Sequence, residues 1–106
     1  MKPTVKLIKL TASGKYHPVI KPELGSLQIR SGRVILRKGE NVGEHITNGV
    51  EELLVILEGT AEVIIHGKKT IKAMKNAAVY IPPNTRHDVR NKNSRVMRYL
   101  YITSPV

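Results

Sequence analysis

The sequence predicts an all-β domain, a sandwich or barrel made of short strands. Three observations support this fold class. Runs rich in Val, Ile and Tyr recur at close spacing, turn residues separate them, and no stretch longer than about ten residues keeps a helical period. Many short strands joined by turns are typical of sandwiches and barrels. A sheet of alternating strands and helices is not expected, because the chain leaves no segments for the helices.

The strand signal recurs along the whole chain. It falls in residues 4–10, 26–30, 33–37, 52–58, 60–67, 69–74, 77–83 and 95–102. In the first of these runs Val5 and Leu7 alternate with Lys6, whereas Ile8 breaks the alternation. Turns are expected at residues 31–33, 38–41, 48–49, 58–60 and 66–68, which carry Gly, Asn and charged residues.

The length of 106 residues corresponds to one small domain, residues 1–106. We expect residues 1–30, with three of the six prolines, to form N-terminal strands or an arm, and residues 31–105 to form the core. The chain has no Cys, so a metal would need His, carboxylate or other nitrogen and oxygen ligands. The N-terminus lacks the apolar stretch of a signal peptide and no run approaches a membrane span, so a cytoplasmic protein without membrane contact is expected.

The formal net charge of +10 raises the question of nucleic-acid binding. The 18 Lys and Arg residues are scattered, however, and the aromatic residues are four Tyr only. No helix-turn-helix, zinc-finger or aromatic RNA-binding pattern is present in the sequence. A solvated basic surface is the favoured interpretation, and a nucleic-acid partner is not expected.

A histidine and a carboxylate lie where a polar, glycine-containing stretch meets an apolar run. His45 precedes Glu52, which opens the run 52–58, and Thr47 should share a face with His45 because side chains two apart on an extended chain point the same way. His87 begins another expected strand far along the chain. Two histidines and one carboxylate from three strands would hold a divalent metal and leave positions open for water or substrate. Spacing alone leaves open that these are isolated histidines beside turns.

The same residues fall on the pattern of a known family. Gly39, His45, Thr47, Glu52 and Gly59 stand at the spacings of the first motif of the cupin superfamily. The chain resembles this family from Ser31 to Pro105, and Thr47 stands where the motif usually has its second histidine.

The second cupin motif has its counterpart in Asn76, Pro82, Asn84, His87 and Asn91. The two positions that are usually glycine are Asn76 and Asn84 in this chain. Asparagine tolerates the left-handed backbone for which glycine is used, so the spacing and the turn geometry are both expected to be kept.

The resemblance implies a cupin-type double-stranded β-helix, a jelly-roll barrel of two antiparallel sheets. It implies a metal held by His45, Glu52 and His87, with Fe, Mn, Ni, Zn or Cu as the candidates. A threonine hydroxyl is a poor ligand for these metals, so Thr47 is not expected to replace the missing histidine. The resemblance further implies a homodimer, in which residues 4–10 are a candidate strand to pair across the two copies.

Several polar residues are candidates for lining the pocket: Thr47, Gln28, Arg98, Tyr99 and Asn91. In the run 95–102, Met97, Tyr99 and Tyr101 form one face, and Arg98 lies on the other with Leu100 and Ile102. An inward Arg98 would bind a carboxylate or phosphate, whereas an inward tyrosine face would offer hydroxyl donors and aromatic walls. The pattern leaves both arrangements open.

Three further titratable residues are expected outside the site. The spacing to Gly59 selects Glu52 over Glu51, which should point toward solvent or a subunit partner. His17, in the proline-containing N-terminal part, and His66, before a glycine turn, are expected at the surface.

Three functions are compatible with this sequence. In the first, the metal acts as a Lewis acid or activates oxygen or water on a small polar substrate, as in cupin dioxygenases, decarboxylases and isomerases. In the second, the pocket binds or senses a small molecule without turnover, as a module without a tightly bound metal. The third and least favoured is a basic protein that contacts nucleic acid.

Overall fold

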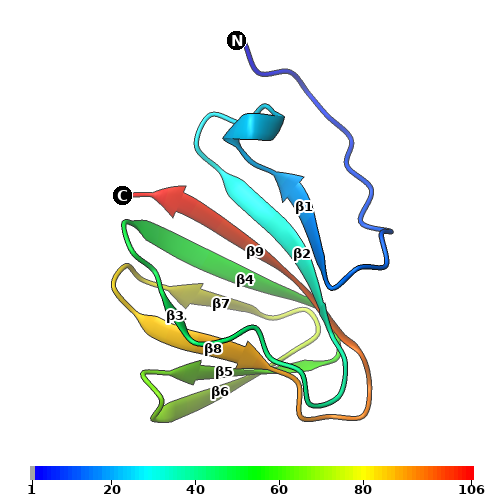
Figure 1. Cartoon of the computed structure of the whole chain (residues 1–106), viewed down its shortest axis with the longest axis vertical. Coiled ribbons are helices and arrows are strands. Elements are labelled where there is room, and N and C mark those ends of the chain that lie inside the picture. The colour runs from blue at the N-terminus through cyan, green and yellow to red at the C-terminus, as the bar shows by residue number, and fades with distance from the viewer. Residues whose placement is uncertain (1) are drawn as a thin grey trace.

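Nine strands form two antiparallel sheets in the computed structural model, which describes residues 2–106 (Figure 1). The larger sheet has the order β1 (Tyr16–Ile20), β2 (Arg30–Leu36), β9 (Met97–Pro105), β4 (Val50–Glu58) and β7 (Ala78–Ile81). The smaller sheet has the order β3 (His45–Ile46), β8 (Arg86–Arg90), β5 (Thr60–Ile65) and β6 (Lys69–Met74). The described residues add one short 3₁₀ helix, η1 (Pro22–Leu24), and contain no helix long and apolar enough to cross a membrane. The prediction of an all-β fold with two antiparallel sheets is confirmed.

The apolar core comes from inward-facing side chains of both sheets. Along β4, Leu54 and Ile56 are buried and pair in register with Tyr101 and Tyr99 of β9. The buried cluster consists of Val34, Leu36, Leu54, Ile56, Ala61, Val63, Ala73, Val79, Ile81, Val89, Met97 and Tyr99. Glu52 lies two residues before Leu54 and therefore continues the inward face of β4 at the end of this core.

The predicted strand at residues 4–10 is not formed. Residues 2–13, called here the N-terminal arm, contain no strand, and the first strand is β1. The side chains of Val5 and Leu7 are exposed, so apolar alternation in this segment does not reflect burial against the sheets. β1 lies within residues 1–30, where N-terminal strands or an arm were expected, but no strand run was assigned at its position because Pro18 weakens the signal. As an edge strand, β1 tolerates the missing N–H.

Two arginines hold the N-terminal arm where a neighbouring strand would otherwise do so. The guanidinium of Arg33 on β2 donates hydrogen bonds to the carbonyl oxygens of Ala12 and Gly14. The guanidinium of Arg98 on β9 donates to the carbonyl oxygen of Leu10 at 2.9 Å. These long-range side-chain contacts are not visible in a local sequence pattern.

The sequence expectations for residues 26–33 are also corrected. Residues 26–29 are irregular, and residues 31–33, expected to be a turn, lie inside β2. Gly32 pairs with Tyr101 across the β2–β9 ladder, and the Ser31 hydroxyl donates to the Tyr101 carbonyl oxygen at 2.7 Å. The glycine therefore serves close packing in a strand, a use that resembles a turn signal in the sequence.

The two asparagines of the second motif adopt the backbone expected of them. Asn76 has a φ angle of 73° and Asn84 one of 59°, both in the left-handed region that usually requires glycine. Asn84 donates its backbone N–H to the Thr47 carbonyl oxygen at 2.7 Å. The turn between β7 and β8 is thereby joined to the chain that follows β3.

Candidate metal centre and pocket

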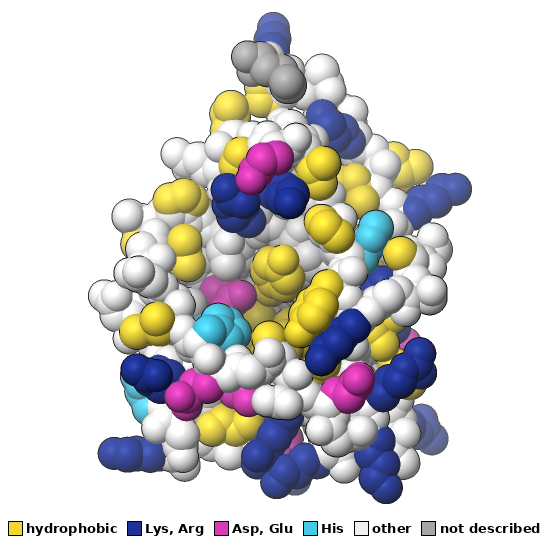
Figure 2. Space-filling view, in the orientation of Figure 1, with side chains coloured by type: hydrophobic (Ala, Val, Ile, Leu, Met, Phe, Trp, Pro, Cys, Tyr) yellow, Lys and Arg dark blue, Asp and Glu magenta, His cyan; other side chains and the backbone are white. Residues whose placement is uncertain are grey.

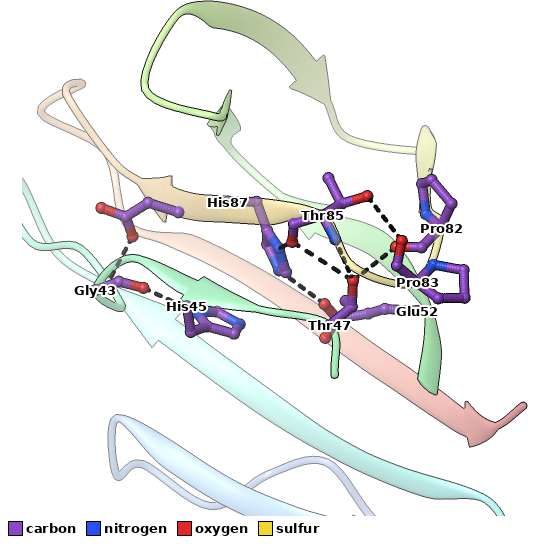
Figure 3. Close-up of polar contacts among 9 residues, drawn as sticks. Gly43, His45, Thr47, Glu52, Pro82, Pro83, Thr85 and His87 are labelled. Carbon is purple, nitrogen blue, oxygen red and sulfur yellow. Dashed lines mark hydrogen bonds and ion pairs between the residues drawn. The ribbon is translucent and has the colours of Figure 1, made fainter. Parts of the chain in front are cut away.

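His45, Glu52 and His87 converge between the two sheets (Figure 3). His45 on β3 lies opposite His87 on β8, and the ring centroids are 4.3 Å apart. Glu52 reaches them from β4 of the larger sheet, with its Oε1 atom 2.9 Å from His87 Nε2. One ligand atom from each residue can be chosen so that all three lie within 4.8 Å of one another. This trio, called here the donor cluster, is therefore close enough to bind one ion.

Backbone carbonyls orient both imidazole rings. The Nδ1 atom of His45 lies 2.9 Å from the Gly43 carbonyl oxygen, and that of His87 lies 3.0 Å from the Thr85 carbonyl oxygen. A carbonyl oxygen can only accept, so each Nδ1 carries a proton and donates it. The Nε2 atom of each neutral ring is then left with a lone pair, which is the arrangement found in metal-binding histidines. The donor cluster fits a divalent metal.

The imidazole of His87 is buried beside the Glu52 carboxylate. Burial opposes protonation of His87, but hydrogen bonds to Glu52 and to the Thr85 carbonyl outweigh it and raise the pKa of this histidine. His87 and Glu52 are only 1% and 7% exposed. Protonation of the His87 imidazole is therefore favoured at this position in spite of the burial.

Thr47 is buried next to the donor cluster but makes structural hydrogen bonds. Its hydroxyl donates to the Pro82 carbonyl oxygen at 2.6 Å and accepts the backbone N–H of Thr85 at 3.0 Å (Figure 3). Thr47 is not among the residues that line the cavity. The hydroxyl joins the end of β3 to the β7–β8 turn and so supports the strand that carries His45.

A cavity of about 450 Å³ opens beside the donor cluster. Its lining consists of Tyr16, Val34, Val42, Gly43, Glu44, His45, Glu52, Leu54, His87, Val89, Tyr99 and Tyr101. The space-filling view shows this hollow between the sheets, with hydrophobic side chains around it (Figure 2). A cavity of this volume can hold a small molecule beside the donor cluster, since such pockets measure about 300–1,000 Å³.

The sequence left open which face of β9 points into the cavity, and the structure shows that the tyrosine face does. Tyr99 and Tyr101 line the cavity, whereas Arg98 lies on the opposite face with its guanidinium bound to the N-terminal arm and 3.6 Å from Glu58. Tyr99 is 3% exposed, and its burial, followed by the charge of Glu52, raises the pKa of its phenol.

The other two pocket candidates do not line this cavity. Gln28 lies exposed in a bend before β2. Asn91 is buried, and its amide donates to the carbonyl oxygens of Leu36 and Arg95. Asn91 thus connects the chain after β8 to β2 and to the segment that leads into β9.

The remaining titratable residues lie away from the donor cluster. Glu51 accepts a hydrogen bond from the Tyr80 hydroxyl at 2.9 Å on the outer side of the larger sheet. His66 is exposed in the β5–β6 turn, and His17 is half-buried on β1. Neither histidine lines the cavity.

Two tyrosines of the cavity wall were not among the pocket candidates named from the sequence, although the face that carries Tyr101 had been left open as an inward one. Tyr101 shares the face of Tyr99, a signal that was present in the alternation of residues 95–102. Tyr16 had no usable signal, since it stands on the unpredicted strand β1. Its position depends on the long-range pairing of Tyr16 with Val34 of β2.

The comparison with protein families agrees with this architecture. The description "Cupin domain" matches residues 32–103, which is well over half of the chain. The chain belongs to the cupin family. Residues 32–103 include all three residues of the donor cluster and most of the strands of both sheets.

Known proteins similar to this cupin include one curated relative and many solved structures. The curated relative is the polyketide synthase CurC of Streptomyces cyaneus, 32% identical over 75 residues that make up 71% of this chain and 48% of CurC. The chain thus spans about half the length of that relative.

Two solved structures illustrate the likeness in fold. The rmlc-like cupin family protein of Methanocaldococcus jannaschii, described as a double-stranded beta-helix, superimposes with a TM-score of 0.81 at 16% identity, over 95% of this chain and 91% of that one. The polyketide cyclase RemF of Streptomyces resistomycificus superimposes with a TM-score of 0.74 at 16% identity, over 84% and 63%. At these identities the likeness concerns the fold.

Proposed function

We propose that this cupin holds a divalent metal through His45, Glu52 and His87 and acts on a small, uncharged molecule bound in the cavity beside it. A polyketide-like molecule, rich in keto and phenol oxygens, is the favoured substrate class. We also propose that the two sheets of this jelly roll form a closed barrel around that cavity.

The observation that carries the metal proposal is the contact between His87 and Glu52. With its Nδ1 proton donated to the Thr85 carbonyl, a neutral His87 would direct the Nε2 lone pair at a carboxylate oxygen 2.9 Å away. Two such electron-rich atoms repel each other unless a proton or a metal ion lies on one of them. A metal with a third donor from His45 satisfies this requirement and uses all three side chains of the donor cluster.

The substrate class is supported by the cavity and by one relative. CurC is named as a polyketide synthase and is 32% identical to this chain over 75 residues. The cavity combines aliphatic walls of Val34, Leu54 and Val89 with phenol groups of tyrosines, and none of its lining residues is Lys or Arg. Such a wall suits a neutral ring system better than a small carboxylate, which would need a cationic partner.

The roles of the chain's own residues follow from this arrangement. A bound metal would supply Lewis acidity toward a keto or enolate oxygen of the substrate. The carbonyls of Gly43 and Thr85 keep the imidazoles of His45 and His87 oriented, and Tyr99 presents a hydroxyl to the cavity. The aliphatic walls of Val34, Leu54 and Val89 would contact the apolar part of the substrate.

Metal analysis of the full-length chain tests the proposal. We expect Zn²⁺ or Ni²⁺ to bind with one ion per chain, measured by isothermal titration calorimetry and elemental analysis, and to be lost in His87→Ala and Glu52→Gln. The matched control is His66→Asn, because His66 is an exposed histidine with a φ angle of 53° that asparagine tolerates. Equal metal content in wild type and His87→Ala would contradict the proposal.

A binding module without turnover is the second candidate. It is favoured by the engagement of the Thr47 hydroxyl with Pro82 and Thr85, which leaves three protein donors at the cluster. Turnover of a keto-phenol substrate that is lost on chelation and restored by one metal would contradict this candidate. Ligand binding that survives chelation without any turnover would support it.

We further propose that two copies associate through the N-terminal arm. Val5 and Leu7 are fully exposed apolar side chains, and the arm is not paired with a strand among the described residues. An exposed apolar segment of this kind is a candidate for pairing with a second chain.

A further inference from the structure

The chain's tyrosines are concentrated at the cavity. Of the four tyrosines, Tyr16, Tyr99 and Tyr101 line it, whereas Tyr80 lies on the outer side of the larger sheet. The Tyr80 hydroxyl is bonded to Glu51, but within residues 2–106 no protein group is hydrogen-bonded to the hydroxyls of the three cavity tyrosines. A buried phenol normally has a partner. The Tyr99 side chain is 3% exposed, but its hydroxyl is not enclosed by protein, and Tyr99 lines the cavity, so a molecule bound there can supply the hydrogen-bond partner.

The position of the Tyr101 ring depends on Gly32. A Cβ atom at position 32 would lie 2.6 Å from both Cε2 and Oη of Tyr101, so a side chain there would require the ring to move. The φ angle of Gly32 is not among the positive values of this chain, so turn geometry does not explain the glycine. A glycine inside a strand costs about 0.5–1 kcal/mol relative to alanine, and close approach of another group is the usual reason for one. The missing side chain at position 32 lets the phenol lie against the backbone of β2.

The charged residues that line the cavity narrow the class of ligand further. The chain carries 18 Lys and Arg residues, yet none of them is a lining residue of this cavity. The lining carboxylates are Glu44 and Glu52. An anionic ligand would therefore meet acidic groups and aliphatic or phenolic walls, whereas an uncharged ring with oxygen substituents would find apolar contact and free hydroxyl groups.

We propose that the pair Gly32 and Tyr101 sets the width of the cavity and, together with Tyr99, makes it specific for a planar, uncharged, fused-ring aromatic molecule that carries a hydroxyl or keto oxygen. This proposal rests on the proposed function, since it names the ligand class of the same cavity. Tyr101 forms the wall beside Gly32, and Tyr99 is a positioning residue whose hydroxyl bonds to the ligand oxygen.

The test compares three probes on the full-length chain, loaded with Zn²⁺ and, in a parallel arm, stripped with a chelator. The probes are 2-naphthol, the single-ring phenol, and 2-naphthoate, which keeps the fused rings and adds a negative charge. We expect stripped wild type to bind 2-naphthol more tightly than either of the other probes, measured by calorimetry and by naphthol fluorescence. Tighter binding of 2-naphthoate to the stripped protein, or no binding of 2-naphthol to either form, would overturn the proposal.

The variant Gly32→Ala displaces the Tyr101 ring into the cavity. The clash involves the far end of a side chain, so the variant should fold. We expect its affinity for 2-naphthol to fall about tenfold or more, with a smaller change for phenol, since a single extra methyl-sized group in a pocket changes selection by roughly 10–200-fold. In a Tyr101→Ala background the same change at Gly32 should have no further effect on naphthol binding. Equal losses in both backgrounds would contradict the role of the pair.

Two more measurements test the proposal if Gly32→Ala does not fold, and test the hydroxyl of Tyr99 separately. If circular dichroism shows that Gly32→Ala does not fold, the Tyr101→Ala variant alone tests the proposal. Tyr101→Ala should lose the preference for 2-naphthol over phenol. An unchanged preference would overturn the proposal. Tyr99→Phe should weaken naphthol binding roughly 2–10-fold, the value of one hydrogen bond, while leaving an aromatic hydrocarbon probe, naphthalene, unaffected. Metal content should be unchanged in Gly32→Ala, so failure of the metal proposal and failure of the ligand proposal give different results.

Discussion

The hydroxyl of Thr47 donates a hydrogen bond to the carbonyl oxygen of Pro82 across 2.6 Å and so joins β3 to the β7–β8 turn. The same oxygen accepts the backbone N–H of Thr85, two residues before His87. One side chain therefore connects the two short segments that present His45 and His87 to the cavity. The position where cupins usually carry a histidine is used here to fix the geometry of its neighbours.

Thr47→Val should destabilise the protein. Valine matches the shape of threonine but leaves the Pro82 carbonyl and the Thr85 N–H without their partner, which costs about 1–3 kcal/mol for buried groups. The free energy of unfolding in urea measures the effect. Thr70→Val on β6 is the matched control, because Thr70 is exposed and should change stability by less than about 0.5 kcal/mol. Equal effects of both substitutions would show that the hydroxyl contacts do not contribute.

Thr47→His should raise metal affinity. Thr47 is buried next to the donor cluster, and a histidine side chain is longer than that of threonine, so an imidazole that reaches the cluster would add a fourth donor. We expect Zn²⁺ to bind at least about tenfold more tightly, equivalent to about 1.4 kcal/mol, together with a loss of stability similar to that of Thr47→Val. Calorimetry with Thr47→Val as the control separates the two effects. An affinity equal to that of wild type would mean that this side chain does not reach the donor cluster.

Gly59→Ala should be among the most destabilising single substitutions. Gly59 has a φ angle of 78°, and a Cβ there would lie 2.8 Å from the Val96 carbonyl oxygen, a backbone atom that cannot move aside easily. Gly49 has a similar φ angle of 74° with nothing within 4 Å of its Cβ position. Gly49→Ala should cost only the left-handed conformation, roughly 1–2 kcal/mol, and Gly59→Ala clearly more. Similar unfolding free energies for the two variants would contradict the role of close packing at Gly59.

Arg33→Met should release the N-terminal arm. Arg33 is fully buried, and its guanidinium binds the carbonyls of Ala12 and Gly14. Hydrogen bonds from charged groups contribute about 1.5–3 kcal/mol each, so trypsin cleavage after Lys9 should become roughly tenfold faster or more. Mass spectrometry of the timed digest measures this rate. Arg95→Met, at an exposed arginine, should leave the rate unchanged.

The association of two copies through the N-terminal arm can be tested at its exposed apolar residues. The double variant Val5→Lys, Leu7→Lys removes the apolar surface and adds charge, so a wild-type dimer should dissociate to monomers in light scattering. Leu27→Lys is the control, because Leu27 is equally apolar and is 75% exposed outside the arm. A wild-type protein that is already monomeric at the same concentration would rule out this association.

The donor cluster could be predicted because its residues stand at positions of the two cupin motifs, whereas their spacing alone left open that the histidines are isolated. His45, Glu52 and His87 are the histidines and the carboxylate at the motif positions, and the structure brings their ligand atoms within 4.8 Å. The left-handed backbone of Asn76 and Asn84 was likewise predictable, because few residues other than glycine tolerate it. The all-β class followed from the close spacing of runs rich in Val, Ile and Tyr, from the turn residues between them and from the lack of a helical period.

The sequence by itself therefore determined the fold class, the two turns at asparagine and the three candidate ligands. Only the tertiary structure decided that Tyr99 and Tyr101 face the cavity while Arg98 binds the N-terminal arm, and that the apolar residues 4–10 do not form a strand. Alternation shows that two faces of a strand differ, but both faces of β9 mix apolar and polar side chains. Which face is buried then depends on the pairing of strands far apart in the chain, such as Gly32 with Tyr101, and no local pattern contains that information.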